Sequence, residues 1–496
     1  MLTGWRLTLS KMSLIPQRYV MGIMGFFAVV NAYTMRISLS VAITEMVIPI
    51  NSTDYDNPDS CPFPNNTGNS SNAVTDEDKL YDWDQTTQGL ILSSFYWGYV
   101  VTHLPGGILA EKFGGKYSLG IGILSTAVFT LLTPLVVGFG DYKWLIALRV
   151  LEGLGEGTTY PALNAMLGKW VPLGERGKIG TLVYAGGQIG TVVGNSLSGY
   201  LIHVTKDWAT VFYVFGALGV LWVILWTLLC YSDPESHPYI SDEERDYLRK
   251  ELNEIATGKA RIIPWRAILT SVPLWALVAA QIGHDWGFFT MVTDLPIYMS
   301  DVLKFNVNEN GVWSSVPYIC MWIVSMSSGW LCDWLIMKQY MTVTFARKFF
   351  TTVASIGPGI FIIAASYAGC DRALVVALFT IAMGFMGTFY CGMKVNALDL
   401  SPNYGGTLMA IVNGIGAITG IITPYLAGAL TGNHTLSEWR LVFWISLGVF
   451  VVTNIIYIAF ASGEEQWWNR IDDPNFKKGT ENGNMEPLKE EKDFKH

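Results

Sequence analysis

The sequence carries little charge for its length. Charged residues make up 15% of its 496 residues, and hydrophobic residues make up 51%. About 25% charged is usual in a soluble protein, and a disordered chain needs low hydrophobicity. The 32 basic residues are outnumbered by 40 acidic ones, so the chain lacks the basic surface that a nucleic-acid-binding protein needs. These shortages exclude a nucleic-acid partner and favour a membrane protein.

Motifs of catalysis are also missing. The sequence has no phosphate-binding loop and no cluster of metal-ligating residues at a useful spacing. Its glycine-rich stretch 153–157 lies inside a predicted helix, where it cannot cradle a nucleotide. We therefore expect no enzyme activity, no metal site and no cofactor beyond a coupling ion.

Long apolar runs fill most of the chain instead. About 20 apolar residues cross a bilayer as a helix, because lipid offers the backbone no hydrogen-bond partners. Twelve such runs predict an all-α membrane protein with twelve transmembrane helices. They lie near residues 19–47, 88–110, 118–139, 144–168, 178–203, 209–231, 271–300, 311–335, 347–369, 373–398, 405–430 and 440–461.

Basic residues predict the orientation of this bundle. With both termini in the cytoplasm, most loop lysines and arginines fall on the cytoplasmic side, as the positive-inside rule requires. In this orientation all four glycosylation sequons fall in loops on the outer side of the membrane. They lie at Asn51, Asn65, Asn69 and Asn433.

Cysteines are few, at six in the whole chain. By this topology only Cys61 and Cys370 face outside, in the first and fifth outer loops. They could form a disulfide, but we expect two unpaired thiols.

A hydrophilic segment after the sixth run divides the chain. Residues 19–231 and 271–461 are predicted to form two six-helix bundles, the first with a glycosylated outer loop at 48–87. Between them, residues 232–270 form a cytoplasmic linker, in which Ser241–Glu244 reads as a capping box for a short helix. Residues 1–18 are a cytoplasmic tail, and the charged segment 462–496 is predicted to be a disordered one.

A weak repeat relates the two halves. Gly107, Glu111 and Lys116 follow the second run, and Gly329, Asp333 and Lys338 follow the eighth at a constant offset of 222 residues. Small-residue stripes that let helices approach closely also recur in the fifth and eleventh runs, at Gly186, Gly190, Gly194, Gly416 and Gly420. Two repeated sets of six helices indicate an alternating-access transporter, with its substrate near the midplane between the halves.

Ionisable residues within the apolar runs mark the candidate site, because charge at bilayer depth is costly. Arg149, Glu152 and Glu156 fall within about 60° of each other on one helical face. Two acids cannot both pair with the single base there. The surplus carboxylate is a candidate proton carrier, whose protonation would free Arg149 to bind an anion. The alternative is a buried ion network that only holds helices together.

Arg36 lies in the first run, on a helical face with Tyr33 and Ser40 and with no acid. Such an arginine suits a carboxylate or phosphate ligand. The alternative is a salt bridge to the acids of the fourth run in the empty state. In the second half His284 occupies the position that corresponds to Arg36, with Asp285 next to it, although a structural histidine is equally plausible. We expect His103, in the second run, to be a packing residue.

These residues also carry a family resemblance. The Gly107–Lys116 loop resembles that of the major facilitator superfamily, with Glu111 where the superfamily usually has Asp. The stretch Arg149–Ala162 is very similar to its counterpart in the solute carrier 17 anion transporters, a family that includes sialin, the vesicular glutamate transporters and the type I sodium–phosphate cotransporters. The segment Gly283–Thr290 resembles the insect branch of that family, labelled inorganic phosphate cotransporters.

The resemblance implies the major facilitator fold of two six-helix bundles and the transport of a small anion with a sodium or proton gradient. It implies anion binding by Arg36 and Arg149 and proton coupling by Glu152 and Glu156. Tyr33, on the helical face of Arg36, and His284, at the corresponding position of the second half, complete the predicted anion-binding residues. The resemblance also implies conformational gating by Gly107, Glu111, Lys116 and Asp333.

The cargo is expected to be inorganic phosphate or a small organic anion. Glutamate is disfavoured as cargo. The vesicular glutamate branch has an arginine at the position of His284 and a histidine at the position of Leu92. A passive anion channel or a non-transporting anion sensor is the alternative function. We expect a monomer in the lipid bilayer of the plasma membrane or of a lysosome or vesicle.

Overall fold

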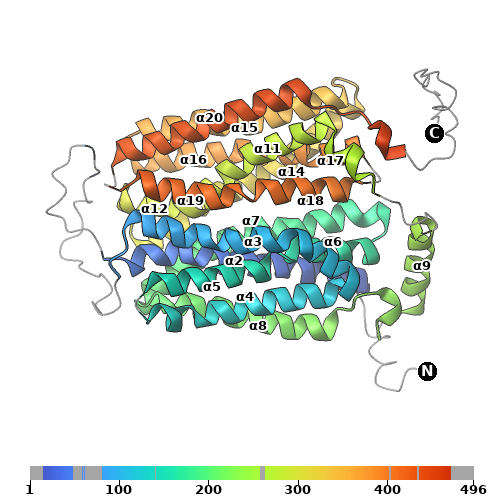
Figure 1. Cartoon of the computed structure of the whole chain (residues 1–496), viewed down its shortest axis with the longest axis horizontal. Coiled ribbons are helices and arrows are strands. Elements are labelled where there is room, and N and C mark those ends of the chain that lie inside the picture. Colours follow the sequence, from blue (N-terminus) through green and yellow to red (C-terminus); the bar gives the residue numbers. More distant parts are fainter. Residues whose placement is uncertain are drawn as a thin grey trace.

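The computed structural model is a bundle of long, roughly parallel helices (Figure 1). It describes residues 15–48, 59, 61, 81–139, 141–238, 240–256, 263–401, 404–432 and 435–470. The all-α fold with twelve membrane-spanning passes, predicted from the apolar runs, is confirmed. The four predicted glycosylation sites and most of both predicted tails lie outside the described residues.

The first six passes form one half of the molecule. They are α2 (Gln17–Met46), α3 (Gln85–Phe113), α4 (Gly115–Val137), α5 (Tyr142–Glu156) continued by α6 (Thr159–Trp170), α7 (Leu173–Thr205) and α8 (Ala209–Leu229). The linker to the second half contains η3 (Pro234–Ser236), α9 (Asp242–Ala256) and α10 (Trp265–Leu269). The short linker helix expected after Ser241 is therefore present as α9.

The last six passes form the other half, which lies beside the first in Figure 1. They are α11 (Val272–Phe289) with η4 (Thr290–Asp294) and α12 (Leu295–Asp301), α13 (Val307–Trp313) with α14 (Val316–Met337), α15 (Val343–Tyr367), α16 (Arg372–Gly387) with η5 (Tyr390–Lys394) and α17 (Val395–Leu400), α18 (Gly405–Gly416) with α19 (Thr419–Leu430), and α20 (Leu436–Phe460). A last turn, η6 (Trp467–Arg470), follows.

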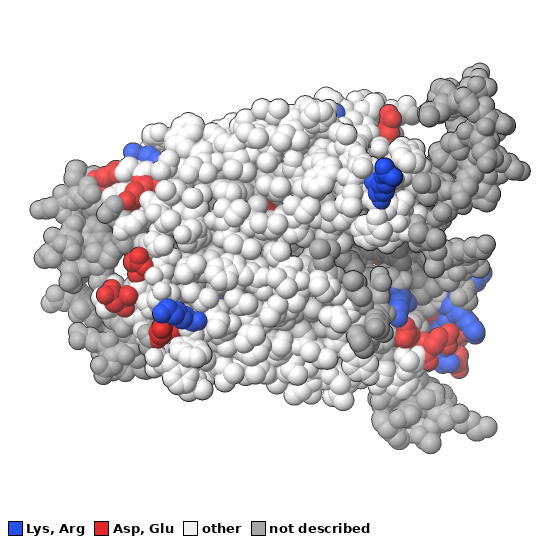
Figure 2. Space-filling view, viewed as in Figure 1, with Lys and Arg blue, Asp and Glu red and all other residues white. Residues whose placement is uncertain are grey.

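The surface of the bundle has the polarity of a membrane protein. Among the described residues, eight helical segments are long and apolar enough to cross a bilayer. Figure 2 shows Lys, Arg, Asp and Glu gathered at the two ends of the molecule, with an almost uncharged band between them. This band matches a hydrocarbon layer about 30 Å thick, in which exposed charge is costly.

Several passes are broken, and proline explains the break in the fourth. Pro161 has no N–H to donate to the carbonyl of Gly157 one turn earlier, so α5 stops at Glu156 and α6 begins at Thr159. The seventh and tenth passes each contain a π-helical turn, η4 and η5. Such turns often occur at functional sites, because they redirect the side chains that follow.

Glycines let α7 pack directly on α2. A Cβ atom at Gly186 would lie 2.6 Å from the carbonyl oxygen of Phe26, and one at Gly190 would lie 2.8 Å from the Cβ of Tyr33. No larger residue fits at either position without a shift of the backbone or of Tyr33. The predicted small-residue stripe of the fifth run therefore fixes the height and rotation of α2 against α7.

The two halves touch most closely at one end of the molecule, here called the disulfide end. Gln85 Nε2 donates to Asp301 Oδ2 at 2.6 Å, and the hydroxyls of Ser196 and Ser315 lie 2.7 Å apart. A Cβ at Gly199 would lie only 2.6 Å from the carbonyl oxygen of Val307. The opposite end carries α9 and both ends of the described chain (Figure 1), and is called the linker end.

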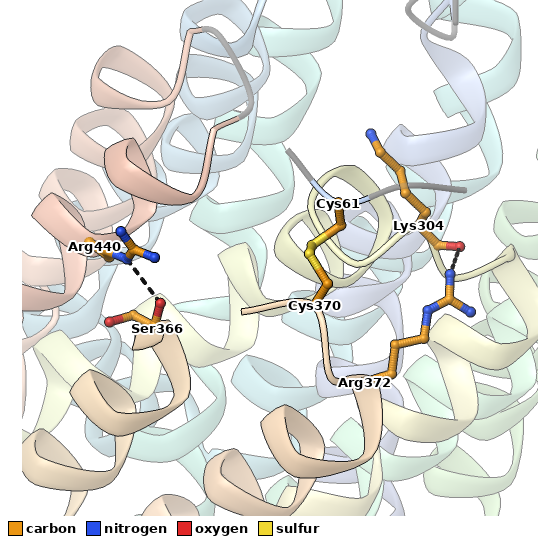
Figure 3. Close-up of a disulfide and its surroundings, with 6 residues drawn as sticks. All are labelled: Cys61, Lys304, Ser366, Cys370, Arg372 and Arg440. Carbon is orange, nitrogen blue, oxygen red and sulfur yellow. Dashed lines mark hydrogen bonds between the residues drawn. A yellow bond between two sulfur atoms is a disulfide. The ribbon is translucent and has the colours of Figure 1, made fainter. Parts of the chain in front are cut away.

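A disulfide joins the halves at the disulfide end. Cys61 precedes α3 and Cys370 lies between α15 and α16, and their Cα atoms are 5.5 Å apart (Figure 3). The expectation of two unpaired thiols was wrong. Asp59 shows the reason, because its carbonyl and carboxylate accept hydrogen bonds from Leu436 N and Ser437 N, each at 3.0 Å. Asp59 and Cys61 thus lie against the second half, at the start of α20 and before α16, a contact that sequence spacing does not reveal.

We expect both cysteines to be protected from a membrane-impermeant maleimide added on the side of the disulfide end. Cys370→Ser frees the Cys61 thiol and raises labelling by one site per chain, and Cys61→Ser frees Cys370 in the same way. Mass spectrometry of the labelled protein counts the sites. The double variant Cys61→Ser/Cys370→Ser is the control and returns to the wild-type level; equal labelling of wild type and single variants would show that the bridge does not form.

Candidate functional site

Two buried ion pairs occupy the core of the first half. In the first, Arg36 Nη2 of α2 donates to Glu156 Oε1 at the end of α5. Arg36 is 5% exposed and Glu156 1%, so neither charge is solvated from the surface. Burial of both charges is tolerated because each neutralises the other.

The second pair lies one turn earlier on α5. Arg149 Nη1 donates to Glu152 Oε2 at 2.5 Å, and Arg149 Nη2 donates to the backbone carbonyl of Arg36 at 3.2 Å. Two hydroxyls of α4, from Thr130 and Thr133, donate to the other Glu152 oxygen at 3.4 Å. The carbonyl contact ties the two ion pairs into one network across α2, α4 and α5.

The surplus carboxylate predicted on the fourth pass is therefore paired from another helix. Glu156 has no base left on its own helix, and Arg36 of α2 supplies the missing charge. The alternative considered for Arg36, a salt bridge to the acids of the fourth pass, describes this conformation. The pattern on one helix could not reveal it, because the partners are 120 residues apart.

Aromatic rings surround the Arg36 guanidinium. Its carbon lies 4.6 Å from the ring centre of Tyr33, 4.9 Å from that of Tyr99 and 5.0 Å from that of Phe95. Phe95 is equally close to the guanidinium of Arg149, at 5.0 Å. Ring faces attract cations, so these rings help to hold the two guanidinium groups in place beside their glutamates. Tyr33 also accepts a hydrogen bond from the Tyr160 hydroxyl at 3.1 Å.

The network leaves hydrogen-bonding capacity unused. Arg36 Nε, Arg149 Nε and Glu156 Oε2 are buried and have no protein partner. Buried polar atoms are nearly always satisfied in a folded protein, so these three atoms call for a partner that the chain itself does not provide. Their chemistry, two guanidinium donors and one carboxylate acceptor, suits an anion accompanied by a proton or cation.

The second half presents a different polar set. The His284 ring of α11 stacks on Phe389 with centroids 3.7 Å apart, and its Nδ1 has no partner. Next to it, Asp285 Oδ1 accepts a hydrogen bond from Gln281 at 2.7 Å. The structure therefore places His284 on the second half, apart from the four charged residues that it brings together in the first.

Lys394 is a site residue that the sequence analysis missed. It ends η5 and donates from Nζ to Asn413 Oδ1 of α18 at 2.6 Å. Its signal was available, since a lysine inside the apolar run 373–398 is as unusual as Arg36 in the first run. Both Lys394 and Asn413 are partly exposed although they lie within membrane-spanning passes.

The two polar sets face each other across the boundary between the halves. Gln188 Nε2 of α7 donates to the Tyr390 hydroxyl of η5 at 2.8 Å, and the Tyr96 ring lies 4.7 Å from that of Phe289. His103 of α3 is buried with its ring 5.3 Å from Tyr99, as expected of a packing residue. Its Nδ1, however, has no partner.

The residues predicted to gate the transporter lie towards the linker end. Lys116 donates from Nζ to the carbonyl of Thr227 at 2.9 Å and sits 3.9 Å from the ring centre of Tyr231. Asp333 is exposed near the end of α14. Gly107 lies in α3, and the side chain of Glu111 is outside the described set.

A further ion pair near this end was also missed. Arg347 of α15 contacts Asp399 of α17 at 2.7 Å and donates to the carbonyl of Cys391 at 2.7 Å. It ties α17 to α15 at the foot of the second half. The pair is partly buried, so it stabilises this arrangement more than an exposed pair would.

Comparison with known proteins places this fold and site in a family. Residues 19–418 match the model of the Major Facilitator Superfamily. The chain is 42% identical to human sialin over 452 residues, which cover 91% of this chain and 90% of sialin. It is 40% identical over 466 residues to a Drosophila melanogaster protein named "Putative inorganic phosphate cotransporter", covering 93% and 88% of the two chains.

Solved structures agree on the fold. A bacterial homolog of the human lysosomal transporter Spinster, solved in an inward-facing and occupied conformation, superposes with a TM-score of 0.65 at 12% identity, over 90% of this chain and 97% of that one. The chain is thus a membrane transporter and not an enzyme, and it belongs to the major facilitator superfamily and, within it, to the solute carrier 17 anion transporter family.

Proposed function

We propose that this protein is a secondary active symporter that moves inorganic phosphate or a small organic anion by alternating access. The observation that carries the proposal is the pair of buried arginines with unused donors, Arg36 and Arg149. A guanidinium presents five N–H donors in a fork that fits carboxylate and phosphate oxygens. The name of the Drosophila relative supports phosphate as cargo.

Charge balance explains how such a site couples two ions. Arg36 and Glu156 are neutral as a pair, and an anion that binds Arg36 leaves Glu156 as an unpaired buried charge. A proton taken up by Glu156 cancels that charge and keeps the buried total unchanged. Binding the anion and the proton together avoids the cost that either would meet alone.

The coupling ion is a proton or a sodium ion. Glu152 and Glu156 favour a proton. Each carboxylate forms an ion pair with an arginine, and protonation neutralises the carboxylate when it releases that arginine. Sodium would act in the same way, by shielding the carboxylate that loses its arginine. Proton and sodium gradients imposed separately distinguish the two.

Alternating access fits the way the halves meet. Their contacts close the disulfide end, whereas Asn164 of α6 and Tyr184 of α7, hydrogen-bonded to each other, remain accessible within membrane-spanning helices. The positive-inside pattern assigns the linker end to the cytoplasm. We therefore propose that the closed disulfide end faces outward in this conformation.

Further properties are part of the same proposal. The protein works as a monomer with both termini in the cytoplasm. It resides in the plasma membrane or in a lysosomal or vesicular membrane. The outer sequons Asn51, Asn65, Asn69 and Asn433 are glycosylated.

Arg149→Ala is expected to abolish uptake of labelled phosphate into proteoliposomes. Loss of a buried charge-assisted contact of about 3 kcal/mol lowers anion affinity on the order of 100-fold. Arg245→Ala removes an arginine from an exposed pair on α9 and is the matched control. Wild-type uptake by the Arg149→Ala protein would refute the site.

A panel of labelled anions, tested with proton and sodium gradients imposed separately, identifies cargo and coupling. A symporter accumulates its anion above equilibrium under one gradient only. Uptake that never exceeds equilibrium under either gradient indicates a passive channel, and anion binding without any uptake indicates a sensor. Either of these results contradicts symport.

The Arg36–Glu156 pair is expected to be strongly coupled in a double-mutant cycle. Glu156→Gln leaves Arg36 buried without a counter-charge, which costs about 3–5 kcal/mol, and Arg36→Gln in that background recovers part of the loss. Thermal unfolding in detergent without anion measures the coupling. The exposed pair Arg245–Asp242 serves as the control, at about 0–1 kcal/mol. Coupling at Arg36–Glu156 no larger than this would show that the buried pair does not hold the empty state.

A further inference from the structure

Lys394 is a cation at membrane depth without an ion-paired acid. Within the described residues it forms no salt bridge, and Asn413 Oδ1 is the hydrogen-bond acceptor of its ammonium. An ammonium group has three N–H donors. Arg36 and Arg149, by contrast, are each held by a glutamate. In this conformation Lys394 is therefore the site cation that is least neutralised.

The nearest carboxylate does not satisfy it. Asp285 interacts electrostatically with Lys394 but lies outside ion-pair distance, and its Oδ1 is taken by Gln281 of the same helix. An unpaired ammonium inside a membrane is costly. Such a residue persists where water or an anion can reach it, and Lys394 and Asn413 are both partly exposed within membrane-spanning passes.

Polar groups with unused hydrogen-bonding capacity lie within electrostatic range of this cation. His284 of α11 and His103 of α3 both interact electrostatically with Lys394. Each has a buried Nδ1 without a hydrogen-bond partner. Gln281 Oε1 is likewise unpartnered. Because α3 belongs to the first half and α11, η5 and α18 to the second, the cluster straddles the boundary at which alternating access moves the halves.

We propose that Lys394 is an anion-binding residue of the second half, and that Asn413 orients its ammonium towards the boundary between the halves. The ligand it takes is a carboxylate or phosphate group. A cargo with two anionic or acceptor-rich ends, such as hydrogen phosphate or a dicarboxylate, then meets Lys394 on one side and the arginines of the first half on the other. This inference rests on the proposed function, that the chain transports anions.

The order of binding follows from the charges. An anion that enters from the linker end meets an ammonium at Lys394 that no described carboxylate pairs, and two guanidinium groups that glutamates still neutralise. Binding to Lys394 breaks no ion pair, whereas binding to Arg36 requires the Arg36–Glu156 ion pair to break. Lys394 therefore receives the anion first, and the arginines take it as the pairs open.

Lys394→Gln in the full-length protein tests this role. We expect the KM for phosphate uptake in proteoliposomes to rise about tenfold or more, which corresponds to about 1.4 kcal/mol of lost binding, with a smaller change in maximal rate. Lys394→Arg keeps the charge and stays within a few-fold of wild type. Lys143→Gln, at the exposed start of α5, is the matched control and leaves the KM unchanged.

A second readout separates binding from a structural role. Inorganic phosphate and succinate are expected to raise the melting temperature of the wild-type protein in detergent. This anion-dependent rise is lost in Lys394→Gln, while the melting temperature without anion stays close to wild type. A Lys394→Gln protein with the wild-type KM and the wild-type anion-dependent rise would overturn the proposal.

Asn413→Asp provides an independent variant if Lys394→Gln does not fold. It places a carboxylate where an amide oxygen now lies 2.6 Å from Nζ, so it neutralises Lys394 at nearly constant shape. The KM is expected to rise as it does for Lys394→Gln, and an unchanged KM would overturn the proposal. A wild-type protein that moves no anion would refute the proposed function itself, whereas active wild type with unaffected variants refutes only the role of Lys394.

Discussion

The neutralisation of charge inside the membrane is the constraint on which the rest of the structure depends. Two arginines lie in the core of the first half, and each is tolerated there because a glutamate neutralises it. Apolar residues at all four positions together would simplify folding. The presence of these charged residues at bilayer depth therefore points to function, since it leaves a site that can exchange an internal carboxylate for an external anion at little net cost in charge.

Helix packing serves this network. Gly186 and Gly190 bring α7 against α2 and so fix Tyr33 and Arg36 in position. The break before α6, caused by Pro161, ends α5 directly after Glu156. The second half has π-helical turns in two of its passes, and one of these ends at Lys394. Each half thus interrupts a helix next to a charged side chain of the candidate site.

The sequence predicted the fold well because the bilayer imposes a simple rule on every pass. The run expected at 118–139 is α4, Gly115–Val137, and the run at 209–231 is α8, Ala209–Leu229. The helical face that joins Arg149, Glu152 and Glu156 was also visible, because it depends only on local periodicity. What could not be predicted was contact between distant helices: Glu156 with Arg36, or Cys61 with Cys370 across 309 residues. Lys394, in contrast, could have been identified as a candidate site residue from the sequence alone, because it is a lysine within an apolar run.

The exchange of Glu156 for an external anion on Arg36 is the central claim, and a structure of the protein with bound phosphate tests it most directly. An oxygen of the phosphate should lie within hydrogen-bond distance of the Arg36 guanidinium, and the contact between Arg36 and Glu156 should be broken. A phosphate-bound structure in which both arginine–glutamate pairs remain intact and the anion lies elsewhere would contradict it.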